Sequence, residues 1–88
     1  MDELTGLQRD IIHVISGTED ATGIDIKEEL EDYHGRDLST KLLPNVNETI
    51  ETGYVQKEWY SKRIPIYSLT QKGKKALNNR IEWENNSR

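Results

Sequence analysis

Residues 38–69 constrain the fold most, because their hydrophobic pattern changes from helical to strand-like around a group of basic residues. The apolar positions of the first part have the i, i+3, i+7 spacing of one helix face: Leu43, Val46 and Ile50. Gly53 follows, where a helix end favours a residue that tolerates positive φ. Two runs rich in strand-forming residues come next, GYVQKEWY and IPIYSL, separated by SKR at 61–63. The predicted order is therefore helix, strand, basic tip, strand.

A first helix is predicted upstream, over residues 5–16. Thr5 and Gln8 have the spacing of a capping box, in which each side chain binds the backbone N–H of the other residue. Apolar residues then recur every three or four positions: Leu4, Leu7, Ile11 and Ile15. Further apolar residues widen this stripe, which suits either a helix buried in its own domain or one that also meets a partner chain.

A second helix is predicted over residues 23–34, with Gly35 as its end. Its expected buried face consists of Ile26, Leu30 and Tyr33. Its outer face is acidic, with Asp25, Glu28, Glu29, Glu31 and Asp32. Since no histidine or cysteine completes an acid–base or metal site there, we interpret these carboxylates as a solvated surface.

The third helix is predicted over residues 39–52, with Asp37 or Ser39 as its cap and a bend at Pro44. Its N-terminal end presents small hydroxyls, a lysine and, one turn later, an amide: Ser39, Thr40, Lys41 and Asn45. Such groups at a helix N-terminus suit contact with phosphates and base edges. The alternative, that the hydroxyls are only caps, stays open from this pattern alone.

A hairpin over residues 54–69 and a last helix over residues 71–84, capped by Thr70, complete one domain spanning 1–88. The hairpin tip has no core to cover, yet it carries Lys62 and Arg63, which is typical of a loop that touches a phosphate backbone or minor groove. The predicted fold class is α+β, mostly α. Its architecture is a winged helix-turn-helix with a three-helix head, a two-stranded wing and a C-terminal helix.

Charge is divided unevenly between the two halves of the chain, whose net charge is −4. Residues 1–35 hold ten acids and two bases, and residues 36–88 hold six acids and ten bases. The net charge is therefore −8 for residues 1–35 and +4 for residues 36–88. This division favours a surface that binds a polyanion on the second segment. Chance clustering of solvated charge is the competing explanation.

Other residue types exclude several classes of protein. The chain has no cysteine, and its two histidines have no ligand-spaced companions, so we expect no disulfide, metal or cofactor. No apolar run approaches a membrane span and no secretory signal pattern is present, so a cytoplasmic protein is expected. Because only 33% of 88 residues are hydrophobic, a dimer would bury more apolar surface. The residues expected at that interface are Leu4, Leu7, Ile11, Leu77, Ile81 and Trp83.

The segment LLPNVNETIETGYVQKEW…RIPIYSLTQKGKKAL resembles winged-helix regulators of the PadR family, in particular short archaeal members. The resemblance is carried by the apolar-Pro step Leu43-Pro44, the start of the wing at 53–55 and the Tyr-x-Leu-Thr-x-x-Gly pattern at 67–73. The last pattern is common to many winged-helix families, and Leu43 stands where PadR proteins usually have an aromatic residue. We expect no counterpart of the long C-terminal helical domain that larger members have. The resemblance implies sequence-specific binding of double-stranded DNA as a dimer, often with repression of nearby genes.

We therefore expect a DNA-binding transcriptional regulator, a dimeric repressor that reads an inverted repeat, and no enzyme. The residues expected to contact DNA lie on the third helix, before it and on the wing: Arg36, Ser39, Thr40, Lys41, Asn45, Lys57, Lys62 and Arg63. The alternative is a winged-helix protein–protein module whose acidic half docks a basic partner. The sequence identifies neither an operator nor a small-molecule effector.

Overall fold

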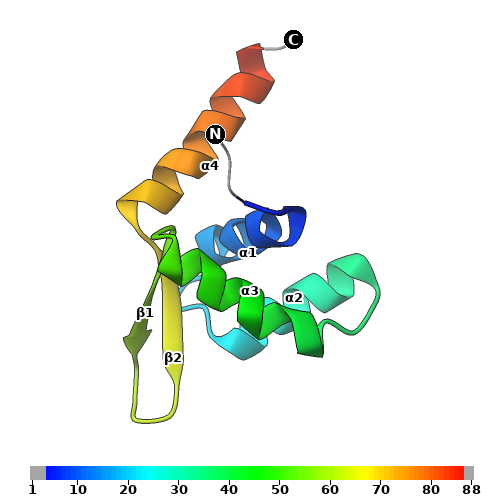
Figure 1. Cartoon of the computed structure of the whole chain (residues 1–88), viewed down its shortest axis with the longest axis vertical. Coiled ribbons are helices and arrows are strands. Elements are labelled where there is room, and N and C mark those ends of the chain that lie inside the picture. The colour runs from blue at the N-terminus through cyan, green and yellow to red at the C-terminus, as the bar shows by residue number, and fades with distance from the viewer. Residues whose placement is uncertain (1–3, 87–88) are drawn as a thin grey trace.

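The computed structural model describes residues 4–86, with side chains described for residues 4–78. This part forms four helices and a two-stranded antiparallel sheet. The elements are α1 (Gly6–Gly17), α2 (Gly23–His34), α3 (Ser39–Glu51), β1 (Val55–Trp59), β2 (Pro65–Leu69) and α4 (Gln71–Asn86). Figure 1 shows α1, α2 and α3 as one head, with the β1–β2 hairpin beside them and α4 extending away. The predicted winged helix-turn-helix architecture is confirmed.

Local sequence signals set the ends of α1 and α2. The Thr5 hydroxyl accepts from the Gln8 N–H at 3.2 Å, and the Gln8 side chain accepts from the Thr5 N–H at 3.2 Å, which confirms the predicted capping box. Thr22 and Asp25 form a second capping box at the start of α2, with distances of 3.2 and 3.1 Å. Gly35 ends α2 with a φ of 70°, in the left-handed region that glycine adopts without steric cost.

The buried face of α3 differs from the predicted one. Leu43 is 58% exposed, and the prediction that it faces the core was wrong. The buried positions follow a different helical phase: Leu38, Leu42, Val46 and Thr49. Thr49, which is not part of the predicted apolar face, is fully buried, and its hydroxyl is satisfied because it donates to the Val46 carbonyl at 2.6 Å. Both phases have helical spacing, so the packing of α3 against the rest of the head decides between them.

One prediction for α2 also needs correction. Ile26 and Leu30 are buried as expected, but Tyr33 is 79% exposed. Its ring lies edge-on to that of His34, with centroids 5.2 Å apart, at the solvent-facing end of the helix. The helix ends one residue later, at His34, whose ring Nε2 lies 3.2 Å from a carboxylate oxygen of Asp10 in α1.

The wing is anchored to the head by a backbone contact that the sequence did not indicate. β1 and β2 pair in an antiparallel register from Val55↔Leu69 to Trp59↔Pro65. Ala21, in the connection between α1 and α2, forms an isolated bridge with Tyr67, whose N–H donates to the Ala21 carbonyl at 2.7 Å. Both residues are buried. The connection between α1 and α2 therefore also acts as a third partner for the hairpin.

The junction between the wing and α4 is tightly packed. The Thr70 hydroxyl donates to the Gly53 carbonyl and accepts from the Gly73 N–H at 3.1 Å, so the predicted cap of α4 is confirmed. The Thr70 N–H donates to the Tyr54 carbonyl at 3.1 Å. The Lys72 ammonium donates to the Thr52 carbonyl at 2.7 Å and lies 4.4 Å from the centroid of the Tyr54 ring. These contacts attach the first turn of α4 to the start of β1.

A single hydrophobic cluster connects the head with the wing. Its buried members come from all three head helices, from the bridging Ala21 and from the hairpin: Ile11, Ile12, Ile15, Ala21, Ile26, Leu30, Leu38, Leu42, Val46, Tyr54, Val55 and Tyr67. Because this one cluster contains residues of both the head and the hairpin, burial of its apolar side chains fixes the position of the wing relative to α3. Within residues 4–86, no helix has both the length and the apolar character needed to cross a membrane.

Candidate nucleic-acid interface

Two carboxylates hold the start of α3. Glu31 of α2 accepts from the Leu38 N–H at 2.7 Å through one oxygen and pairs with Lys27 at 3.1 Å through the other. Asp37 accepts from both the N–H and the hydroxyl of Ser39, at 2.8 and 2.5 Å. Glu31 was expected to be part of a solvated face, but its bond to the backbone ties α2 to α3. The first turn of α3 is thus fixed from both sides.

The geometry also corrects the predicted cap. Leu38 occupies the N-cap position, so neither Asp37 nor Ser39 is the cap by position. Asp37 nevertheless satisfies an N–H of the first turn from just outside the helix. The Ser39 hydroxyl, followed by the Ser39 N–H, stabilises the ionised carboxylate and lowers the pKa of Asp37 from 3.8 to about 2. Ser39 therefore already has a partner, whereas Thr40 and Lys41 beside it are exposed.

Asn45 lies in a different environment from the other predicted contact residues. Its side-chain carbonyl accepts from the Gln8 amide of α1 at 3.0 Å, and its amide nitrogen donates to the Lys41 carbonyl at 2.7 Å. Gln8 is itself buried, with only 6% of its surface exposed. Both ends of the Asn45 amide are thus engaged inside the domain, which joins α1 to α3.

The predicted basic residues of the wing lie on its solvent side. Lys62 and Arg63 are exposed in the loop between the strands, which is closed by a bond from the Tyr60 N–H to the Ile64 carbonyl at 2.9 Å. Lys57 is exposed on β1, with its ammonium 5.1 Å from the centroid of the Trp59 ring. Arg36 is exposed in the turn between α2 and α3.

A groove brings the wing tip and the start of α3 together, although they are distant in sequence. Its volume is about 390 Å³, and Ser39 and Leu43 line one side while Arg63 and Ile64 line another. Residues at the start of α2 complete it, including Ile24 and Lys27. Three of its apolar side chains are strongly exposed: Ile24 at 68%, Leu43 at 58% and Ile64 at 44%. The sequence did not predict this groove, because it depends on the helical phase of α3.

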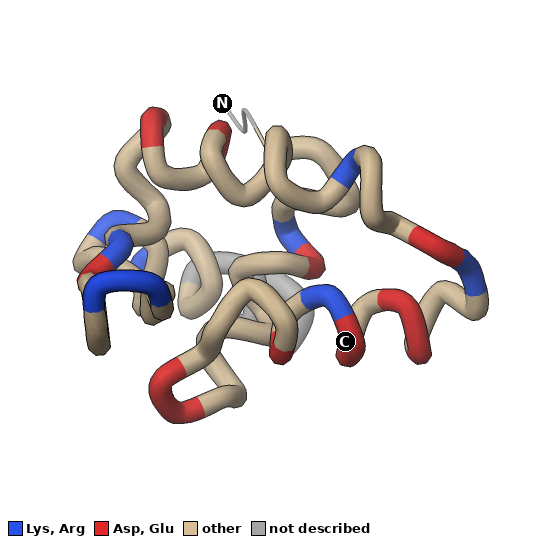
Figure 2. Tube along the Cα trace, turned by 90° about the horizontal axis from the view of Figure 1, so that it is seen from below, with Lys and Arg blue, Asp and Glu red and all other residues tan. Residues whose placement is uncertain are grey.

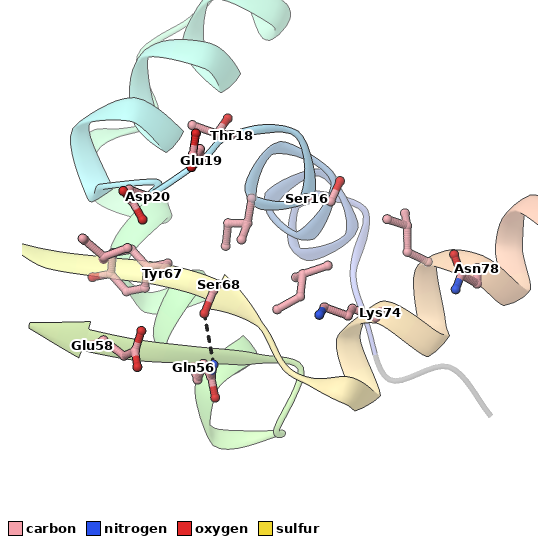
Figure 3. A pocket seen from close by; sticks show the side chains of 14 residues that line it. Ser16, Thr18, Glu19, Asp20, Gln56, Glu58, Tyr67, Ser68, Lys74 and Asn78 are labelled. Carbon is pink, nitrogen blue, oxygen red and sulfur yellow. Dashed lines mark hydrogen bonds between the residues drawn. The ribbon is translucent and has the colours of Figure 1, made fainter.

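A second cleft lies between α1, the hairpin and the start of α4, with a volume of about 560 Å³ (Figure 3). Its polar lining comes from several elements, and the labelled side chains include Ser16, Glu19, Glu58 and Lys74. The two clefts share Tyr67, whose burial raises the pKa of its phenol. In the part of the chain that the structure describes, no group of three or more histidine, cysteine, aspartate or glutamate side chains is arranged to hold a metal ion.

The charges follow the division seen in the sequence. Figure 2, seen from below, shows blue segments gathered on the side of the wing. The opposite side holds α2, whose acids outnumber its single lysine. The wing tip therefore offers a local positive potential on a chain of negative net charge.

The residues predicted for a dimer interface lie in three kinds of place. Leu4 and Leu7 are partly buried against the core, and Leu77 of α4 is partly buried at the second cleft. Ile11 is fully buried within the single chain, so it belongs to the domain's own core and not to a surface that a partner could reach. Ile81 and Trp83 belong to α4, but their side chains lie outside the described residues.

The chain is similar to several solved structures of RosR from H. salinarum. One, grown from NaBr, is 35% identical; the alignment covers 93% of this chain and 74% of that one, with a TM-score of 0.85. The RosR-S1 complex is 35% identical over 93% of this chain and 73% of that one, with a TM-score of 0.86. The RosR-SG complex is 34% identical over 97% and 76%, with a TM-score of 0.89. No protein-family model and no curated protein matches the sequence. At this identity and coverage, the chain belongs to the family of RosR, a winged-helix transcriptional regulator.

Proposed function

We propose that this protein is a sequence-specific transcriptional regulator that binds double-stranded DNA through α3 and the wing. The observation that carries the proposal is the groove at which the N-terminal turn of α3 meets the wing tip, with Arg63 on its rim and Lys41 and Lys62 exposed nearby in the chain. An α-helix fits the major groove of B-DNA, and a basic loop beside it reaches the adjacent backbone. The family supports the same class, since RosR is a DNA-binding regulator.

The contacts divide by role. Lys57, Lys62 and Arg63 of the hairpin and Arg36 of the turn before α3 lie outside the helix that would enter the major groove, so we assign them to phosphates. Thr40 and Lys41 on the exposed side of α3 are assigned to the major groove. Asn45, whose amide is bound on both sides inside the domain, fits a role in holding α3 against α1 better than the base contact first expected of it.

The finer parts of the proposal concern assembly and outcome. We propose a dimer that reads an inverted repeat with half-sites about 10 base pairs apart, or a multiple of that, and that represses transcription. Support comes from the small hydrophobic fraction of the chain and from the apolar positions that α4 adds beyond the head, Leu77, Ile81 and Trp83. The apolar-Pro step at 43–44 and the start of the wing at 53–55 support placing the protein among PadR-like regulators.

Salt dependence tests the proposal. If the four cations assigned to phosphates all touch them, the log–log slope of affinity against salt is expected to be about −3.6 per protomer, at roughly 0.9 per contact. The double change Lys62→Ala and Arg63→Ala should reduce the magnitude of the slope by about 1.8 and weaken binding to all duplexes alike. The matched control is Lys74→Ala with Lys75→Ala, which removes the same charge from α4.

The measurement is fluorescence anisotropy over a salt series, after selection of duplexes from a random pool. An unchanged slope in the wing variant would remove the wing from the interface. Failure of the wild-type protein to enrich any sequence would contradict sequence-specific DNA binding altogether. A winged-helix module that binds only another protein would give that second result.

A further inference from the structure

We infer that Asn47 is a base-reading residue of α3, with an amide matched to adenine. This inference rests on the proposed DNA-binding function and adds a specificity-determining residue to it. The observation behind it is the contrast between two asparagines two positions apart on one helix. The Asn45 amide is hydrogen-bonded within the domain, whereas Asn47 is exposed.

The helical phase of α3 places Asn47 on its outward side. The buried residues Leu42, Val46 and Thr49 define the inner face of the helix. Asn47 lies seven positions after Thr40, and this spacing of about two turns puts both on one outer stripe. Leu43, four positions before Asn47, stands at the edge of that stripe toward the groove and the wing.

The Asn47 amide is available for a ligand. Asn47 is exposed, and its side chain forms no hydrogen bond with any residue that the structure describes. An asparagine amide offers a donor and an acceptor side by side, which matches N7 and N6 of adenine in the major groove. Asn45 would have to break its bonds to Gln8 and to the Lys41 carbonyl before it could do the same.

Neighbouring groups give the stripe a consistent chemistry. Pro44 has no N–H, so it cannot donate the usual i+4 helical bond to the Thr40 carbonyl. Leu43 supplies an exposed apolar surface, which is suited to the methyl group of thymine. The carboxylates of Glu48 and Glu51 follow Asn47, and their negative charge repels the phosphate backbone of DNA. Asn47 is therefore the last neutral hydrogen-bonding side chain on the stripe before the acidic end of α3.

The test compares substitutions of the two asparagines against a panel of operators in which each base pair is changed in turn. Asn47→Ala should keep the thermal stability of the wild type and lose discrimination at one A·T pair, by roughly 5- to 150-fold. Asn47→Asp keeps the shape but removes the donor, so its preference at that pair should move toward the cytosine amino group. Asn45→Ala should lower thermal stability and change affinity by the same factor for every operator. Asn78→Ala, an exposed asparagine on α4, is the control and should change neither property.

Each result bears on a different proposal. If the wild-type protein selects a sequence and Asn47→Ala keeps the same preference at every position, the inference about Asn47 is wrong while DNA binding stands. If Asn47→Ala and Asn47→Asp both fail to fold, the Asn47 side chain is needed for folding, and the inference that its amide is free to contact DNA is wrong. If the wild-type protein selects no sequence, the proposed function itself fails.

Discussion

Gly73 provides the sharpest test of how α4 is attached to the wing. A Cβ atom at this position would lie 2.1 Å from the Tyr54 carbonyl oxygen, 3.1 Å from its carbon and 3.4 Å from the Leu69 Cβ. The obstructing atom is backbone, and it already accepts the Thr70 N–H at 3.1 Å. The change Gly73→Ala therefore has no flexible side chain to push aside and must move α4 away from β1.

The cost of Gly73→Ala can be worked from these contacts. Overpacking of a rigid site costs about 1–3 kcal/mol. Displacing α4 also weakens the Thr70 hydrogen bonds to Tyr54 and Gly73, each worth about 1 kcal/mol. The higher helix propensity of alanine returns about 1 kcal/mol. We expect a net loss of about 2–3 kcal/mol in the free energy of unfolding, or roughly 10–20 °C in Tm for a domain of this size.

The assay is urea and thermal unfolding followed by circular dichroism at one protein concentration. Gly6→Ala is the matched control, because Gly6 also lies in the first turn of a helix and has nothing within 4 Å of its Cβ position. Gly6→Ala should be neutral or slightly stabilising. A Gly73→Ala variant within about 0.5 kcal/mol of the wild type, the usual range for surface changes, would refute the close approach of α4 to the Tyr54 carbonyl.

Two further predictions concern assembly and acid stability. Ile81→Glu should lower both Tm and operator affinity, with a larger loss on a duplex with two half-sites than on one; a variant that sediments as a monomer yet binds the full site undiminished would defeat the dimer. The pKa of Asp37 is about 2 in the folded state against an ordinary value of 3.8, so its contribution to stability is present above pH 4 and is lost as pH falls toward 2. Unfolding of Asp37→Asn should lack this component between pH 4 and 2, and identical pH profiles for the two proteins would contradict it.

Much of the fold follows from local signals in the sequence. The Thr5 capping box, the glycine end of α2 and the Thr70 cap of α4 were predictable because each depends on residues four or fewer positions apart. The alternation of β1 and β2 around a basic loop likewise predicted the hairpin. These features need no knowledge of distant contacts, since backbone geometry fixes which neighbours can meet.

The rotation of α3 about its axis was not determined in this way. Leu42 and Leu43 are adjacent leucines, and either completes an apolar stripe with Val46. The structure buries the first and exposes the second, which changes the residues that face outward. The same rotation turns Asn45 toward Gln8 and leaves Asn47 in solvent.

The sequence by itself thus determined the order and ends of the elements, the basic wing tip and the uneven distribution of charge. Tertiary packing alone decided the Ala21–Tyr67 bridge, the bond from Glu31 to the start of α3 and the burial of Ile11 within the domain. The physical reason is the distance along the chain over which each kind of interaction acts. Caps and turns are stabilised by neighbours along the chain, whereas the side of a helix that is buried depends on the shape of the surfaces it meets.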